Sequence, residues 1–134
     1  MDEERRRDAA AEVALGLDAL LAATTLLEAG LPNDAVSRAY YAAFHHARAL
    51  LLLRGLEPKT HRGVISLLEK HFADAGLLSH AVVSAMARLE TFRGIADYDT
   101  TQRLSQERAR TEVDDARLVV DSCAVLLRAE GVSS

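Results

Sequence analysis

The sequence predicts an all-α protein, an antiparallel up-and-down bundle of about five helices that forms a single domain over residues 1–134. Three observations lead to this prediction. Apolar residues recur three and four positions apart along most of the chain, as they do on one face of an α-helix. Only two prolines interrupt the pattern, and each lies close to a glycine in a short polar break. No pair of alternating segments around a tight turn, the pattern of a β-hairpin, is present.

The first two helices are separated by the break Gly30–Asn33. The first is expected from about Asp2 to Ala29, and the second from Asp34 to Arg54. Gly30 suits the left-handed conformation that ends many helices, and Asn33 or Asp34 is expected to cap the second helix. The first helix carries one apolar stripe that is predicted to face the core, formed by Ala9, Val13, Leu17, Leu20, Leu21, Thr24 and Leu27.

Three more helices follow, separated by polar turns at residues 55–59, 74–76 and 99–102. They are expected at about Thr60–Ala73, from an N-cap at Ser79 to about Asp97, and from about Leu104 to Ala129. In the first of these helices, the residues predicted to face the core are Val64, Leu67, Leu68 and Phe72. Because the connections are short, consecutive helices should be antiparallel neighbours.

Composition and charge narrow the class of protein. Hydrophobic residues make up 49% and charged residues 27% of the chain, as in globular proteins. The net charge of −4 means that the chain as a whole does not attract nucleic acid, although a local basic patch still can. Uninterrupted apolar runs such as Ala49–Leu53 are far shorter than the roughly 20 residues of a membrane helix. The charged N-terminus does not resemble a secretion signal, so we expect no membrane association and a cytoplasmic protein.

No metal site and no cofactor are expected. His45 and His46 are adjacent and therefore point to different sides of a helix. Glu69 and His71 lack the Glu-x-x-His spacing of a carboxylate di-metal bundle. The single cysteine, Cys123, excludes an internal disulfide and a cysteine-rich zinc site, and it is expected to be an inert core thiol.

The second predicted helix carries two rows of residues with different chemistry. Ala35, Ala39, Ala43 and Ala47 are four positions apart and form a ridge of small side chains, which lets a neighbouring helix approach closely. Arg38, Tyr41, His45 and Arg48 share a second face. This row is either a solvated or internally satisfied polar stripe, or a basic and aromatic surface that binds phosphate and stacks on bases.

The turn before the third helix gathers positive and titratable groups. Lys59, His61 and Arg62 lie at an expected helix N-terminus, where free backbone N–H groups favour anions. The alternative is purely structural: Thr60 caps the helix and the turn is solvated. No partner of His61 can be identified from the sequence, so it is not assigned as a base.

The end of the fourth helix places an arginine, two carboxylates and a tyrosine within residues 93–99. These residues include Arg93, Asp97 and Tyr98. The structural alternative is that Arg93 and Asp97, four positions apart, form an ordinary salt bridge within the helix.

Three segments together resemble the HEPN domain, and more closely its small, stand-alone prokaryotic branch: DAVSRAYYAAFH at 34–45, PKTHRGV at 58–64 and RGIADY at 93–98. The resemblance covers nearly the whole chain. It implies a helical bundle that dimerises and that is often encoded beside a minimal nucleotidyltransferase. Many members of this family are ribonucleases and act as toxins in toxin–antitoxin pairs. Their cleavage site is an Arg-x(4–6)-His motif near the fourth helix, duplicated across the dimer interface.

The resemblance makes Arg93, Asp97 and Tyr98 the candidate catalytic residues. This chain departs from the motif, however, because Arg93-x4-Tyr98 stands where the family has a histidine. Arg38 with His45, and Arg54 with His61, have the Arg-x6-His spacing but lie in other segments. Cleavage of RNA without a metal needs a group that moves protons near neutral pH; a histidine does so, whereas an unperturbed tyrosine, with a pKa of about 10, is a poor base. In some toxin members a tyrosine near the motif accepts a nucleotide from the partner enzyme, a role that the resemblance extends to Tyr98.

The resemblance and the residues together predict the HEPN half of a two-component, toxin–antitoxin-like module, a homodimer that binds RNA or a nucleotide and a nucleotidyltransferase partner. The residues expected to bind RNA or a nucleotide are Arg38, Tyr41, His45, Lys59 and His61. His45 or His61 could supply acid–base chemistry if the fold brings either near Arg93. The alternative function is a non-catalytic homodimeric adaptor, and a small-molecule site between helices stays open.

Overall fold

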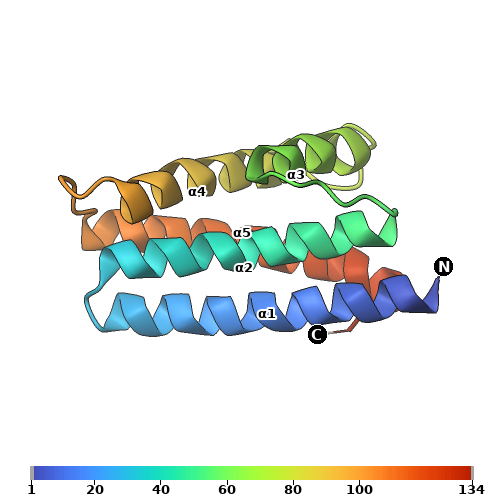
Figure 1. Cartoon of the computed structure of the whole chain (residues 1–134), viewed down its shortest axis with the longest axis horizontal. Helices are drawn as coiled ribbons and strands as arrows, with labels where there is room; N and C mark the ends of the chain where they lie inside the picture. The colour runs from blue at the N-terminus through green and yellow to red at the C-terminus, as the bar shows by residue number, and fades with distance from the viewer. Residues whose placement is uncertain (1, 134) are drawn as a thin grey trace.

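The computed structural model describes residues 2–133 and shows five α-helices and one π-helical turn. They are α1 (Glu3–Glu28), α2 (Pro32–Leu53), α3 (His61–Leu68), the π-helical turn η1 (Glu69–Ala73), α4 (His80–Tyr98) and α5 (Gln106–Ala129). The four long helices run up and down beside one another, and α3 with η1 forms a short excursion between α2 and α4 (Figure 1). No strand occurs between residues 2 and 133, and the predicted all-α bundle is confirmed.

Short polar side chains begin most of the helices. Asp2 accepts a hydrogen bond from the Glu4 backbone N–H at the start of α1. Thr60, Ser79 and Ser105 act in the same way at the starts of α3, α4 and α5. Each cap satisfies a backbone N–H that has no partner within the first turn of the helix. The predicted caps at Thr60 and Ser79 are therefore confirmed.

The predicted cap of α2 is wrong. This helix begins two residues earlier, at Pro32, and its N-cap Leu31 makes no side-chain hydrogen bond. Proline fits the first helical position because its missing N–H would have no partner there in any case. Asn33 instead reaches the α4–α5 connection: its Oδ1 accepts from the Leu104 backbone N–H at 2.9 Å, and its Nδ2 donates to the Gln102 carbonyl at 3.4 Å.

Helix α2 is the centre of the bundle, with contacts to α1, α3, α4 and α5. The predicted ridge of small residues is fully buried, since Ala35, Ala39, Ala43 and Ala47 are all 0% exposed. Small side chains allow the axes of neighbouring helices to come close together, which explains why α2 can be surrounded.

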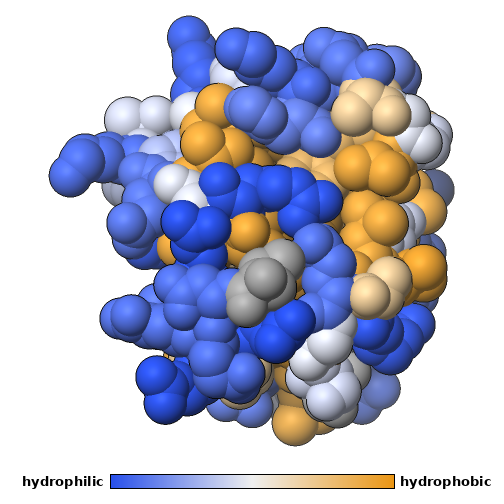
Figure 2. Space-filling view, turned by 90° about the vertical axis from the view of Figure 1, so that its right-hand side faces the viewer, coloured by the Kyte–Doolittle hydropathy of each residue, from blue (hydrophilic) through white to orange (hydrophobic). Residues whose placement is uncertain are grey.

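The predicted core stripe of α1 is wrong in part. The buried residues of this helix are Ala9, Val13, Gly16, Ala19 and Ala23, whereas Leu17 and Leu21 are 38% and 67% exposed. The reason is the close approach of α1 to α2, which selects the small residues of α1 for the interface and leaves its large leucines outside. Leu118 and Val125 of α5 are exposed as well. Viewed from the end where α1 begins, hydrophobic residues gather along one side of the molecule (Figure 2).

Helix α1 bears on the expectation that no segment of the chain is apolar enough to cross a membrane. It contains an 18-residue stretch with a mean hydropathy of 1.6, long and apolar enough to cross a membrane by length and composition alone. The stretch was not predicted from the sequence, because only apolar runs without any charged residue were considered there. Core helices of soluble proteins and signal sequences meet the same criterion, so the cytoplasmic location stays a prediction.

Glu112 of α5 is a charged residue inside the core, 0% exposed. Its Oε2 accepts from Arg108 at 3.3 Å, while its Oε1 is buried without a hydrogen-bond partner. Burial raises the pKa of this carboxyl above the ordinary value of 4.5, and the nearby Asp115 adds to the effect. Ionised Glu112 therefore costs stability at neutral pH.

We expect Glu112→Gln to raise the free energy of unfolding at pH 7 by about 1 kcal/mol, because it removes a buried charge. Because the pKa of Glu112 is raised in the folded state, protonation of its carboxyl at low pH stabilises the folded wild type. This stabilisation is lost as the pH rises and Glu112 ionises. The difference between the two proteins should therefore shrink as the pH falls toward 4.5. Urea unfolding across this range tests it, with the exposed Asp114→Asn as control; a variant that is less stable at pH 7 would contradict the prediction.

Candidate functional site

Arg93 lies near the end of α4 with only 8% of its side chain exposed. Its Nε and Nη2 donate to the two carboxylate oxygens of Glu90, at 3.1 and 2.7 Å, and its Nη1 donates to Asp97 at 3.4 Å. The predicted ion pair with Asp97 is present. The shorter, bidentate ion pair with Glu90 was not predicted. Hydrogen bonding to Glu90 raises the pKa of Arg93, so the guanidinium stays charged.

Two tyrosine rings lie against this guanidinium. The Arg93 Cζ atom is 5.2 Å from the ring centroid of Tyr40, on α2, and 5.6 Å from that of Tyr98. Tyr40 is fully buried, whereas Tyr98 is 76% exposed. The cation therefore contacts one ring inside the bundle and one at its surface, both at distances typical of cation–π contacts.

Tyr40 connects Arg93 to a histidine. The Tyr40 hydroxyl and His61 Nδ1, on α3, form a hydrogen bond of 2.6 Å. Burial and the negative charge of Glu90 raise the pKa of Tyr40, so its phenol stays protonated. The hydrogen bond fixes Nδ1 of His61 and leaves Nε2 as the ring nitrogen that can exchange protons with a ligand. Of the two histidines considered for acid–base chemistry, the structure thus places His61 beside the Arg93 centre.

The polar row on α2 is divided into two parts by a residue of α1. Arg38 is exposed and its guanidinium lies 4.9 Å from the ring centroid of the half-buried Tyr41. His45 Nδ1 donates to Glu12 at 2.6 Å, and Arg48 Nε lies 3.3 Å from the other carboxylate oxygen of Glu12. The basic and aromatic surface is therefore open at Arg38 and Tyr41, whereas Glu12 holds His45.

The structure brings most of the predicted site residues into one continuous group. Tyr41 lies 6.2 Å from His61 between ring centroids, so Arg38 and Tyr41 adjoin the Tyr40 and His61 pair. Lys59 is exposed in the α2–α3 connection and lines the same pocket as His61. Tyr40 and Glu90 were not predicted as site residues from the sequence. The three-residue spacing from Glu90 to Arg93 could have revealed Glu90, but nothing local connects Tyr40 to His61.

Two other groups contain residues with nucleophilic or metal-binding side chains, Cys123 and the set Glu69, Asp74 and His80. Cys123 is fully buried, and burial raises its pKa to about 12, so the thiol is inert as predicted. Glu69, Asp74 and His80 offer ligand atoms within 4.8 Å of one another. This combination was not predicted from the sequence, because the residues come from three segments of the chain. All three are exposed, and exposed acidic groups of this kind are common without a metal.

The fold and the site define a small helical-bundle protein with an arginine- and tyrosine-centred polar site between its second, third and fourth helices. The chain belongs to the HEPN domain family, whose model matches residues 16–126. A protein of Methanocaldococcus jannaschii named as a putative toxin is 36% identical over 121 residues, which cover 90% of each chain. A second protein of that organism with the same description is 33% identical over 67% of this chain and 61% of its own. A UPF0332 protein of Pyrococcus horikoshii is 49% identical over 44% of this chain and 42% of its own.

Proposed function

We propose that the protein is the HEPN half of a two-component, toxin–antitoxin-like module and that it binds RNA or a nucleotide together with a partner protein. The observation that carries this proposal is the likeness to the M. jannaschii relative named as a putative toxin, which extends over 90% of both chains. The polar group formed by Arg38, Tyr41, His61 and Arg93 is the surface on which RNA would bind.

The residues of this group have different tasks in the proposal. Arg38 and Tyr41 are accessible, so Arg38 takes a phosphate and Tyr41 offers a ring for stacking. Arg93 is already paired with Glu90 and Asp97, so it binds phosphate only if one of these carboxylates gives way. His61, held through Nδ1 by Tyr40, is the histidine that would move protons in place of the one that the family motif lacks.

The partner would meet the end of α4. Tyr98 is 76% exposed there, so a nucleotidyltransferase can reach its hydroxyl group. A homodimer and a nucleotidyltransferase partner remain parts of the proposal that come from the family resemblance.

A non-catalytic homodimeric adaptor is the second candidate function. It is favoured by one observation: the charge of Arg93 is balanced within its own helix by Glu90 and Asp97, as in a purely structural ion-pair network. In that case the polar group serves only to hold α2, α3 and α4 together.

A measurement of the affinity for single-stranded RNA distinguishes the RNA-binding function from the adaptor function. Arg38→Gln is expected to weaken binding about tenfold, since it removes one charge-assisted phosphate contact. Arg110→Gln makes the same change in net charge at an exposed position of α5 and should have little effect. The purified protein is also incubated with RNA in EDTA, with and without the His61→Asn substitution, to test for cleavage.

An RNA affinity that falls equally in both arginine variants would show attraction by net charge alone. No affinity in the wild type would favour the adaptor. Cleavage that survives His61→Asn would remove the proposed role of His61 and leave RNA binding in place.

A further inference from the structure

Helix α1 presents apolar side chains to solvent that no other part of the described chain covers. Its 18-residue stretch of mean hydropathy 1.6 has only 22% of its residues buried. The outer side of a surface helix in a soluble protein ordinarily carries charged and polar residues. Here Leu17 and Leu21 lie on that side and are exposed. An exposed apolar surface of this kind is typical of a site that binds another molecule.

Seven positions of α1 share this side of the helix, and we name them the outer face of α1. They are separated alternately by three and four residues, the spacing with which two long helices pack against each other. All are exposed except Thr24, which is half-buried. The outer face consists of Arg7, Ala10, Ala14, Leu17, Leu21, Thr24 and Glu28.

The outer face carries opposite charges at its two ends and none between them. Arg7 and Glu28 are exposed, and neither forms an ion pair within residues 2–133. The hydroxyl of Thr24 donates to backbone carbonyls of α1 itself, so it asks for no partner outside the helix. A second copy of this face, turned end over end, would place each Arg7 opposite the Glu28 of the other copy. The face is therefore complementary to itself, as the contact surface of a two-fold symmetric dimer is.

The side chains between the charged ends also suit an antiparallel pair of helices. Ala10 and Ala14 are small enough to let a second helix approach closely, and the two leucines supply the apolar area. Asp18 is the unfavourable residue, because it lies beside the outer face near its centre and would come close to its own copy. One such repulsion is set against two Arg7–Glu28 attractions.

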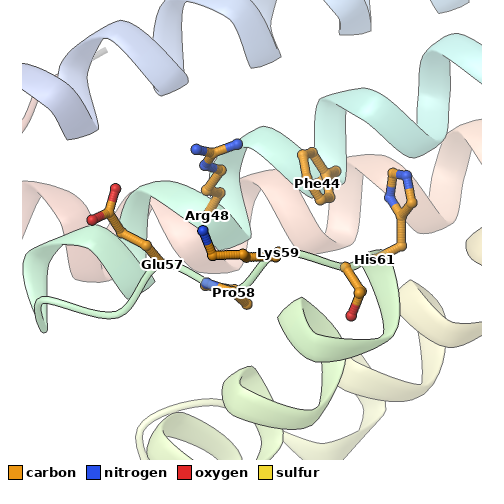
Figure 3. Close-up of a pocket in the computed structure, with 7 residues that line it drawn as sticks. Phe44, Arg48, Glu57, Pro58, Lys59 and His61 are labelled. Carbon is orange, nitrogen blue, oxygen red and sulfur yellow. The ribbon is translucent and has the colours of Figure 1, made fainter.

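The outer face of α1 is remote from the polar site. Helix α1 contacts α2 and α5 but not α4, and Figure 1 shows α1 and α4 on opposite sides of the bundle. The cavity lined by Arg48, Lys59 and His61 (Figure 3) also contains no residue of α1. An association through α1 therefore leaves the Arg93 centre and this cavity uncovered.

We propose that two copies of this chain associate through the outer faces of their α1 helices, packed antiparallel with Arg7 of each opposite Glu28 of the other. The family resemblance, by contrast, implies a dimer contact near the Arg93 motif. The inference rests on the proposed function only in expecting a homodimer, and it does not depend on RNA binding.

Sedimentation equilibrium over a wide range of protein concentration measures the association. Leu21→Gln should weaken it at least tenfold, because the substitution removes an apolar contact from both halves of the dimer. Leu77→Gln is the matched control, since Leu77 is 47% exposed but lies in the connection between η1 and α4; it should change the association less than twofold. Circular dichroism checks that both variants keep the helical fold.

Exchange of the two end charges tests the antiparallel arrangement. Arg7→Glu and Glu28→Arg should each weaken the association about tenfold at low salt, because each places like charges opposite one another twice in the dimer. The double variant should return to within about twofold of the wild type, since it restores both pairs. Each single variant suits the dipole of α1, so a weakened helix does not explain the loss. Asp18→Asn should strengthen the association several-fold at low salt.

The outcomes separate this contact from the proposed function. A dimer that neither Leu21→Gln nor the charge variants weaken overturns the α1 contact and leaves the proposed homodimer in place. A wild type that stays monomeric at every concentration overturns both. Loss of association in the single charge variants without recovery in the double variant overturns the antiparallel arrangement.

A lipid surface is the other occupant that an apolar helix face could have. Vesicles of phosphatidylcholine and phosphatidylglycerol test it by co-sedimentation. Binding of the wild type but not of Leu21→Gln to these vesicles, without self-association, overturns the proposal. The affinity of Arg38→Gln for single-stranded RNA tests the RNA-binding function independently of these results.

Discussion

Gly16→Ala is expected to lower the free energy of unfolding by about 2–3 kcal/mol, since an added methyl group would overlap a fixed side chain. A Cβ atom at Gly16 would overlap His46 Nδ1 and would lie 2.6 Å from His46 Cε1. His46 is 0% exposed, and its Nδ1 donates to the Ala42 carbonyl at 2.9 Å. The ring cannot turn away without losing this hydrogen bond, so α1 and α2 must separate instead.

Gly94→Ala is the control for this prediction. Gly94 also lies within a helix, but a Cβ there would meet no atom within 4 Å. Replacement of a helical glycine by alanine usually stabilises a protein by about 0.5–1 kcal/mol, so the two variants should move in opposite directions. Urea unfolding monitored by circular dichroism measures both. If Gly16→Ala is as stable as the wild type, the close contact between α1 and α2 at His46 is wrong.

Arg93→Gln is expected to cost about 2–3 kcal/mol of stability. Removing one partner of a buried ion pair costs about 3–5 kcal/mol, because it leaves the other charge uncompensated. The expected loss for Arg93→Gln lies below this general range, because the Glu90 and Asp97 side chains are 29% and 26% exposed and water can solvate them in part. The substitution also removes the cation that lies against the Tyr40 ring inside the bundle.

A double variant, Glu90→Gln with Arg93→Gln, separates the ion pair from other effects of Arg93. It removes both charges of the tightest pair, so it should be more stable than the sum of the two single losses predicts. A double-mutant cycle from urea unfolding measures this coupling, and strictly additive losses would show that the pair contributes nothing. The same double variant is needed in RNA-binding experiments, because a loss of binding by Arg93→Gln alone is also explained by a weakened fold.

The interactions at this site differ in how far the sequence could reveal them. Arg93 with Asp97 was predicted, because residues four apart on a helix are neighbours whatever the rest of the chain does. The hydrogen bond between Tyr40 and His61 joins two helices and spans 21 positions of the sequence. The hydrogen bond between His45 and Glu12 also joins two helices and spans 33 positions of the sequence. It occupies His45, which belongs to the predicted basic row of α2. Pairings of this kind depend on how helices are placed against each other.

The sequence by itself determined the helices of this protein, the caps at Thr60 and Ser79 and the buried alanine ridge of α2. Each of these follows from interactions within one or two turns of the chain, and so from spacing alone. The tertiary structure decided which face of α1 is buried. There the close approach to α2 favours Gly16 and Ala19 over the larger Leu17 and Leu21. It also decided that His61 adjoins the Arg93 centre and that Arg48 and Lys59 share a cavity, because only helix packing brings distant segments together.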